Sequence, residues 1–146
     1  MTKYQKYSLF VLRVSMGWMM LYAGVTKITD PSWSAAGYLT SAKSLSGFFA
    51  WFAQPGALPF TNFINEWGLT LLGLSLILGI GVRLSAWLGF VLMLLYYFPI
   101  LDFPYPNAHS YIVDEHLIYA FALLILGAFK TGNIWGLDPK LKSLFG

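Results

Sequence analysis

The sequence predicts an all-α protein, a polytopic membrane four-helix bundle, and three observations lead to this prediction. First, 58% of the 146 residues are hydrophobic and only 10% are charged, whereas a soluble domain carries roughly a quarter charged residues. Second, four apolar segments approach or exceed the length of about 20 residues that a helix needs to cross a bilayer. Third, turn and loop signals separate these segments. The predicted spans cover residues 7–27, 60–82, 84–101 and 112–130, and residues 1–146 form a single domain.

The first span, residues 7–27, has an arginine inside an apolar run. A charge at such a depth is costly in a membrane and is usually kept facing the protein interior or a wet cavity. We therefore expect one stripe of this helix to face the other helices. At 3.6 residues per turn, that stripe contains Arg13, Gly17, Met20, Gly24 and Lys27.

The connections between the later spans predict which helices are neighbours. Residues 79–83 form so short a break that the second and third spans should be antiparallel neighbours. The sequence DFPYPNAHS between the third and fourth spans contains two prolines and an asparagine, and it predicts a loop.

The basic residues predict the orientation in the membrane. With the N terminus inside, only Lys27 and Lys43 lie on the outer side, and Arg13 lies within the first span. The positive-inside rule therefore predicts that both termini are cytoplasmic. The basic residues expected on that side are Lys3, Lys6, Arg83, Lys130, Lys140 and Lys142.

Residues 32–53 form a segment that is too polar at its start to span a membrane. Its many aromatic residues favour one or two helices lying in the outer interface, where aromatic rings prefer to sit. We expect this segment to form a lid over the outer mouth of the bundle. A mobile connecting loop is the alternative.

Several chemistries are excluded or disfavoured by the composition. The chain has no cysteine, so by itself it performs no disulfide exchange and holds no thiolate metal site or iron–sulfur cluster. No nucleic-acid partner is expected. His109 and His116 are seven residues apart across a loop, which is not a known ligand pattern, and there is no third imidazole. We therefore expect no metal or haem.

The second span contains one carboxylate, Glu66. An isolated carboxylate in hydrocarbon protonates or finds a cation, and the candidate partners are Arg13 and Lys27. A direct pair requires the long arginine to reach towards Glu66, and a bridge through water or Asn62 is an alternative. Two interpretations stay open: an ion pair that fixes the helix register, and a role in substrate or proton handling.

The sequence YIVDEH, residues 111–116, opens the fourth span with three ionisable side chains. Asp114 is expected to cap the helix, because carboxylates favour the N-terminal turn. Glu115 and Tyr119 share one helix face, and His116 lies on another. A histidine beside carboxylates suits proton transfer near neutral pH. An ordinary interfacial histidine is the alternative.

These features together predict an outer-side pocket between the four helices, covered by the lid. Such a pocket fits a flat, lipid-soluble ligand such as a quinone, bound as a diffusible co-substrate, stacked on rings and hydrogen-bonded at its carbonyls. Its reduction consumes two protons, for which the candidate catalytic residues are Glu66, Glu115 and His116. The candidate residues for binding the quinone or a substrate are Arg13, Lys27, Trp33, Tyr38, Tyr97, His109 and Tyr119. For Tyr97 the alternative is an aromatic belt at the membrane surface.

Three stretches of the sequence resemble the DoxX superfamily. They are RVSMGWMMLYAGVTKITDPSWSAAGYL, the second-span glutamate with LLGLSLILGIGVRLSA, and YIVDEHLIYAFALLILGAFKTGNIWGLD. The WSAAGYL segment and the glycine-leucine-aspartate ending are most similar to the DoxD branch, the small membrane subunit of thiosulfate:quinone oxidoreductase. The resemblance covers nearly the whole chain.

The resemblance implies a four-helix bundle in the plasma membrane of a prokaryote. It also implies oxidation of thiosulfate to tetrathionate at the outer face, with electrons passed to a membrane quinone and a DoxA-like second subunit as partner. The family motif positions fall on Arg13, Gly17, Lys27, Glu66, Arg83 and His116.

A second reading of the sequence is a non-catalytic accessory or assembly subunit of a larger respiratory or photosynthetic membrane complex. Its support is the small size, the apolar surface and the absence of a cofactor-ligand motif. Transport of a lipid or small solute is less favoured, because no span is broken. A homo-oligomer is compatible with every reading.

Overall fold

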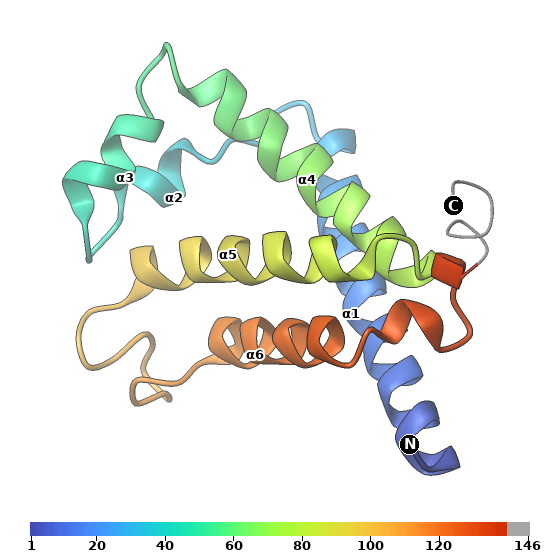
Figure 1. Ribbon diagram of the computed structural model, residues 1–146. Coiled ribbons are helices and arrows are strands. Elements are labelled where there is room, and N and C mark those ends of the chain that lie inside the picture. The colour runs from blue at the N-terminus through green and yellow to red at the C-terminus, as the bar shows by residue number, and fades with distance from the viewer. Residues whose placement is uncertain (140–146) are drawn as a thin grey trace.

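The computed structural model describes residues 1–139 and shows a protein built almost entirely from helices (Figure 1). No strand occurs within residues 1–139, so the predicted all-α class is confirmed. Lys140 and Lys142, which we assigned to the cytoplasmic side, lie outside the described residues. The helices are α1 (Lys3–Thr29), α2 (Ala36–Thr40), α3 (Ser46–Phe52), α4 (Leu58–Leu78), α5 (Val82–Ile100), α6 (Glu115–Ala128) and the short 3₁₀ helix η1 (Thr131–Asn133).

The four long helices lie where the apolar segments predict them, and local signals set their ends. α1 begins before the predicted residue 7 because the Thr2 side chain accepts a hydrogen bond from the Gln5 backbone N–H in a capping box. α4 stops at Leu78 instead of residue 82, since Gly79 adopts a left-handed conformation with φ of 70°. α6 begins at Glu115 instead of residue 112.

Asp114 sets the start of α6, as predicted. Its side chain accepts a hydrogen bond from the Leu117 backbone N–H at 3.2 Å. The residues before it belong to the loop that the prolines predict, and Ile112 has a left-handed φ of 57°, which is incompatible with helix.

Two of the long helices, α1 and α5, are long and apolar enough to cross a membrane. α6 is apolar but has 14 residues. α4 has 21 residues, and its first half carries polar side chains at Thr61, Asn62, Asn65 and Glu66. The two candidate spans fit a helical membrane protein. The four-span bundle and its orientation stay predictions.

The long helices form two antiparallel pairs, α1 with α4 and α5 with α6 (Figure 1). The pairs converge where α4 turns into α5. Towards the other end α4 and α5 diverge, and α2 and α3 lie across that end. Residues 32–53 thus contain two short helices, as expected for the lid, while their place at a membrane interface stays a prediction.

α1 and α4 pack backbone against backbone. A Cβ atom on Gly24 would lie 2.5 Å from the Thr70 backbone nitrogen, and one on Gly73 would lie 2.4 Å from the Leu21 backbone nitrogen. Small residues permit this approach. The predicted stripe of α1 faces the other helices: Lys27 is half-buried, and the buried members are Arg13, Gly17, Met20 and Gly24.

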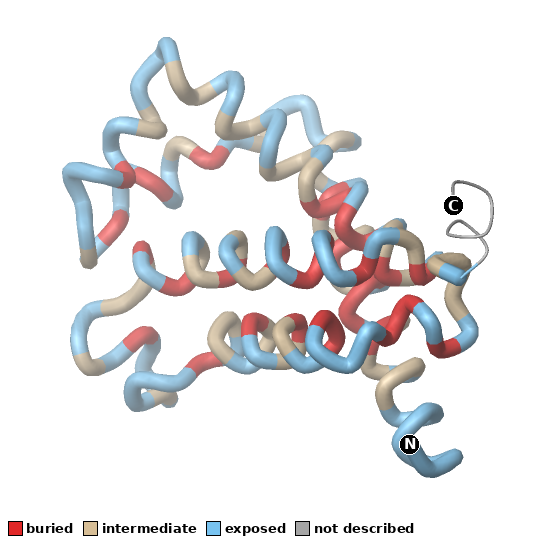
Figure 2. Tube along the Cα trace, in the orientation of Figure 1, coloured by how far each residue is buried: buried red, intermediate tan, exposed pale blue. Residues whose placement is uncertain are grey.

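Buried residues of all four long helices gather at the converging end and the middle of the bundle (Figure 2), and their apolar side chains form the main core. They are Met16, Met20, Leu69, Leu72, Leu76, Val82, Met93, Ala120, Leu123 and Leu126. A separate cluster of Ala35, Leu39, Ala42 and Phe49 lies at α2 and α3. Between the two clusters, beneath α2 and α3, the packing leaves room for a pocket.

Arg13 lies fully buried at the converging end. Its Nη1 donates hydrogen bonds to the backbone carbonyls of Thr131 and, at 2.9 Å, Ile134, and its guanidinium lies 5.3 Å from the centre of the Phe10 ring. The two carbonyls belong to the segment after α6, and that of Thr131 also accepts from the Ile134 N–H at 2.9 Å within η1. Arg13 therefore fastens this segment to the bundle.

Backbone hydrogen bonds hold the same segment against the turn between α4 and α5. The Leu137 N–H donates to the Leu78 carbonyl at 3.1 Å, and the Asp138 N–H donates to the Gly79 carbonyl at 2.9 Å. The Gly81 N–H in turn donates to Asp138 Oδ1 at 2.7 Å. The converging end is thus closed by polar contacts around one arginine.

We predict that Arg13→Met lowers the free energy of unfolding by roughly 2–4 kcal/mol, because two buried carbonyls lose a charged donor. Lys6→Met, at an exposed position of the same helix, should change it little. Thermal unfolding of the detergent-solubilised protein measures both. Equal unfolding temperatures for the two variants would contradict a structural role of Arg13.

We also predict that Gly73→Ala destabilises the protein by about 3 kcal/mol, because its new methyl group would meet backbone atoms of α1 that cannot move aside. Gly68 lies on the same helix with its nearest neighbour at 3.9 Å. Gly68→Ala should therefore be stabilising by up to about 1 kcal/mol. Chemical denaturation in mild detergent compares them, and a Gly73→Ala protein as stable as Gly68→Ala would refute the backbone contact.

Candidate functional site

Two cavities lie beneath α2 and α3, and they share a wall. The first has a volume of about 140 Å³ and is almost entirely apolar. Its lining includes Leu39, Phe49 and Phe52 from α2 and α3, Phe60 and Ile64 from α4, and Leu92 and Leu95 from α5. The second has a volume of about 250 Å³ and is more polar. Its lining includes Lys27, Trp33, Ser34 and His116, and the residues common to both cavities are Ala35, Tyr38, Asn65 and Tyr96.

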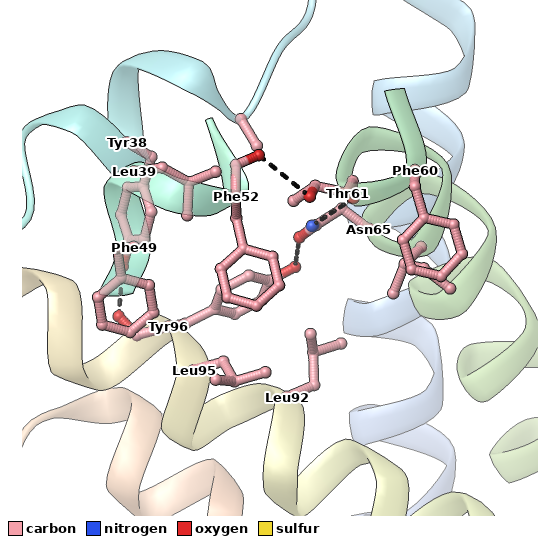
Figure 3. A pocket seen from close by; sticks show the side chains of 12 residues that line it. Tyr38, Leu39, Phe49, Phe52, Phe60, Thr61, Asn65, Leu92, Leu95 and Tyr96 are labelled. Carbon is pink, nitrogen blue, oxygen red and sulfur yellow. Dashed lines mark hydrogen bonds between the residues drawn. The ribbon is translucent and has the colours of Figure 1, made fainter. Parts of the chain in front are cut away.

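Hydrogen bonds hold the shared wall together (Figure 3). The Tyr38 hydroxyl donates to the backbone carbonyl of Tyr96. The Tyr96 hydroxyl donates to Asn65 Oδ1 at 2.5 Å, and the Asn65 amide donates to the Thr61 carbonyl at 2.8 Å. One chain of contacts therefore ties α2, α5 and α4 together at the point where the bundle opens.

The Tyr38 hydroxyl stays protonated over the physiological range. Burial, reinforced by the negative charge of Asp114, raises the pKa of Tyr38 to about 12. At neutral pH this side chain is accordingly a hydrogen-bond donor in the wall between the cavities.

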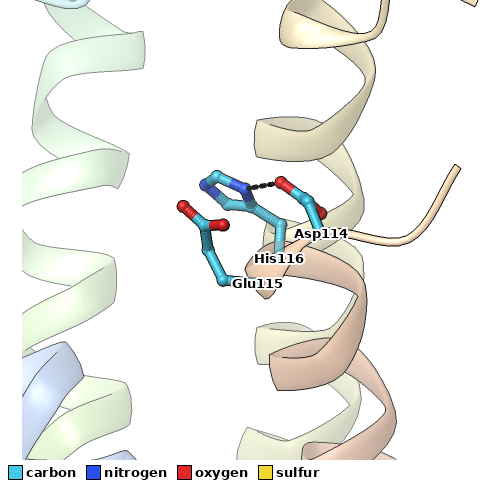
Figure 4. Close-up of side chains that lie close together, drawn as sticks. All are labelled: Asp114, Glu115 and His116. Atoms are coloured by element: carbon cyan, nitrogen blue, oxygen red, sulfur yellow. Dashed lines mark hydrogen bonds and ion pairs between the residues drawn. The ribbon is translucent and has the colours of Figure 1, made fainter. Parts of the chain in front are cut away.

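The imidazole of His116 reaches the polar cavity from the start of α6 (Figure 4). Its Nδ1 lies 2.6 Å from Oδ2 of Asp114, which is buried. Asp114 Oδ2 accepts a hydrogen bond from the tautomer that carries its proton on Nδ1, and that tautomer leaves Nε2 available as an acceptor. The Tyr96 ring packs against the imidazole nearly edge to face, with 6.2 Å between the two ring centres. This arrangement suits proton exchange through Nε2.

Asp114, Glu115 and His116 each offer one ligand atom, and these atoms lie within 4.8 Å of one another (Figure 4). Both oxygens of Asp114 already have partners, namely the Leu117 N–H and His116 Nδ1. Glu115 is exposed. The expectation that no metal binds here stays an expectation.

Lys27 and Trp33 complete the polar cavity. The Lys27 ammonium donates to the Ala23 carbonyl at 3.1 Å and lies 5.3 Å from the centre of the Trp33 ring. The structure thus brings together four of the residues singled out in the sequence, which are Lys27, Trp33, Tyr38 and His116.

Arg13 and Glu66 do not pair. Because α1 and α4 are antiparallel, Arg13 lies beside Gly79, about 20 Å along α4 from Glu66 at 1.5 Å per residue. Glu66 is half-buried and lines neither cavity, and its carboxylate has no hydrogen bond or salt bridge within residues 1–139. Asn62 has no hydrogen bond to Glu66 within residues 1–139, and its Oδ1 accepts from the Ala35 N–H at 3.0 Å. A bridge through water stays a prediction.

Three further candidates lie outside the two cavities. Tyr97 is buried and its hydroxyl donates to the Ile112 carbonyl at 2.5 Å. Tyr119 is half-buried against the main apolar core. His109 is exposed in the loop before α6. Lys43, expected on the rim, is paired with Asp102 at 3.8 Å.

Sequence reasoning missed Asn65 and Tyr96, the two central residues of the wall. The signal for Tyr96 was its spacing of four from Leu92, which places both on one face of α5. Tyr97 instead continues the stripe of Gly89 and Met93, which is buried in the bundle. The signal for Asn65 was an amide side chain in an apolar helix. Such a side chain needs a hydrogen-bond partner on a neighbouring helix.

Comparison with known proteins places the chain in a family. No curated protein and no solved structure matches it. The family model described as DoxX matches residues 8–101, from α1 to the end of α5. His116 and the other residues of α6 lie beyond the match. The chain belongs to the DoxX family, whose members are generally membrane proteins associated with quinone-linked oxidoreductases.

Proposed function

We propose that this protein is a quinone-binding membrane subunit of an oxidoreductase that resembles thiosulfate:quinone oxidoreductase, as in the DoxD branch of the family. The observation that carries the proposal is the pair of cavities with a common wall. An apolar cavity beside a polar one matches a molecule with a prenyl tail and a polar ring.

The apolar cavity suits the tail. It lies between the diverging parts of α4 and α5, and its wall of leucine, isoleucine and phenylalanine side chains offers no competing hydrogen bonds. We propose that the tail enters here and that the ring reaches the wall formed by Tyr38, Asn65 and Tyr96. The amide and hydroxyl groups of that wall would bind the ring carbonyls.

The polar cavity suits the proton chemistry. Two electrons and two protons convert a quinone into a quinol, and His116 Nε2 lies at the cavity with Asp114 behind it to stabilise an imidazolium. We propose His116 as the proton donor to the ring and exposed Glu115 as the group that resupplies it from solvent. Glu66 remains a candidate proton carrier whose role rests on the family motif.

Thiosulfate is the proposed electron donor. Two thiosulfate ions form one sulfur–sulfur bond and release two electrons, which together with two protons reduce one quinone to quinol and leave tetrathionate. Lys27 at the polar cavity supplies the positive charge that attracts the dianion. A DoxA-like subunit is the proposed partner for this step.

Quinone binding to the wall is tested by Tyr96→Phe. Loss of the hydroxyl should weaken binding of a short-chain quinone about fivefold, because one ordinary hydrogen bond contributes about 1 kcal/mol to binding. Tyr97→Phe is the matched control, since it removes the neighbouring hydroxyl, which faces the loop instead. Quenching of Trp fluorescence by quinone measures both, and equal affinities would exclude the wall as the binding site.

The proton-donor role is tested by His116→Ala. General acid catalysis contributes typically 100-fold or more, so thiosulfate-dependent quinone reduction by the purified protein with its partner subunit should fall by about that factor, with quinone affinity little changed. His109→Ala, at an exposed loop position, should leave turnover intact. Unchanged turnover in His116→Ala would remove the histidine from the mechanism. Stable association with a larger complex and no redox activity at all would instead favour the accessory subunit.

A further inference from the structure

A third cavity lies at the opposite end of the molecule, where α5 begins and α6 ends. Its volume is about 580 Å³. It is lined by two basic side chains, Arg83 and Lys130, by the amide of Asn133, and by apolar side chains of the first turns of α5. No part of the proposed quinone site contributes to it.

Both cations are available to a ligand. Arg83 and Lys130 are exposed, and neither forms a salt bridge with a carboxylate in the part of the chain that the structure describes. Asp138 also lines the cavity, and one of its oxygens accepts the hydrogen bond from the Gly81 N–H. The charged side chains of the lining therefore sum to one net positive charge.

The start of α5 adds to the positive potential. This helix has no acidic residue in its first turn, and the carboxylate bonded to its N-cap, Asp138, is already counted in the net charge of the lining. The partial positive charge of the first N–H groups therefore adds to that net charge. Arg83 lies in that same turn. The cavity is consequently a cationic recess with hydrogen-bond donors on the Arg83, Lys130 and Asn133 side chains, which is the chemistry that binds a phosphate group.

The apolar flank of the cavity distinguishes a lipid from a free anion. Leu84 and Trp87 line it and are 66% and 56% exposed, although both side chains would be buried by preference in a soluble protein. They lie in the first turns of α5, one of the two candidate membrane spans. A tryptophan at this level is typical of the boundary between headgroups and acyl chains.

From this juxtaposition we infer that the recess formed by Arg83, Lys130 and Asn133 binds the phosphate of an anionic phospholipid, whose acyl chains lie along Leu84 and Trp87. Basic recesses between membrane helices bind such headgroups on the cytoplasmic side, where positive-inside counting places this end. The bound lipid would join the turn between α4 and α5 to the segment after α6, next to the contacts made by Arg13.

Native mass spectrometry of the full-length protein in detergent tests this inference, with phosphatidylglycerol and phosphatidylcholine supplied in equal amounts. We expect preferential retention of phosphatidylglycerol, reduced about fivefold in Arg83→Gln and about 25-fold in Arg83→Gln with Lys130→Gln, because each basic residue contributes a comparable attraction. The matched control, Lys3→Gln with Lys6→Gln, removes two exposed cations from the same expected side and should retain the lipid as the wild type does.

Three results would overturn the assignment. They are equal retention of the two lipids, wild-type retention by the double variant of the recess, and displacement of the retained lipid by an equal concentration of inorganic phosphate, which would indicate a site for a free anion. Arg83→Lys keeps the charge and should keep most of the preference for phosphatidylglycerol. If this variant also lost the preference, the cause would be a general folding defect. Quinone binding, at the other end of the molecule, is measured separately and does not enter this test.

Discussion

The close contact between α1 and α4 determines the shape of the rest of the molecule. Backbone atoms of the two helices meet at Gly17, Gly24 and Gly73, where any side chain would intrude. Such contact joins the helices into one rigid unit. α5 and α6 form the second unit, and because the units converge at one end only, they leave a space between α4 and α5 that α2 and α3 cover (Figure 1).

The two ends of the bundle use polar groups in opposite ways. At the converging end, Arg13 donates to two backbone carbonyls, and the N–H groups of Leu137, Asp138 and Gly81 donate the hydrogen bonds that close the structure. At the open end, the Tyr96 hydroxyl donates to Asn65 and the Tyr38 hydroxyl donates to the Tyr96 carbonyl across helices. These side chains face a cavity together with His116, which bonds to Asp114. A charge in the membrane region marks function or structure. The contacts of Arg13 support a structural role, and its expected part in ligand binding stays a prediction.

This division is the basis of the proposed quinone site in so small a chain. A hydrocarbon-lined cavity between two helices and a polar cavity with a carboxylate-supported histidine need only one shared wall to accommodate both parts of a quinone. The histidine comes from α6, which the family match does not reach. The proposed chemistry therefore depends on the packing of α6 against α5, which brings the Tyr96 ring and the His116 imidazole together.

The sequence by itself determined the helical class, the four long helices, the loop before α6, the Asp114 cap and the buried stripe of α1, because these follow from local apolar periodicity, proline and capping chemistry. It also singled out Lys27, Trp33, Tyr38 and His116, which the fold assembles around one cavity. Only the tertiary structure decided that Arg13 and Glu66 are far apart and that Tyr96 rather than Tyr97 faces the cavity. The physical reason is that the partner of a side chain, and the direction in which it faces, depend on how the packed helices are aligned and rotated against each other. The local sequence of one helix does not specify this alignment.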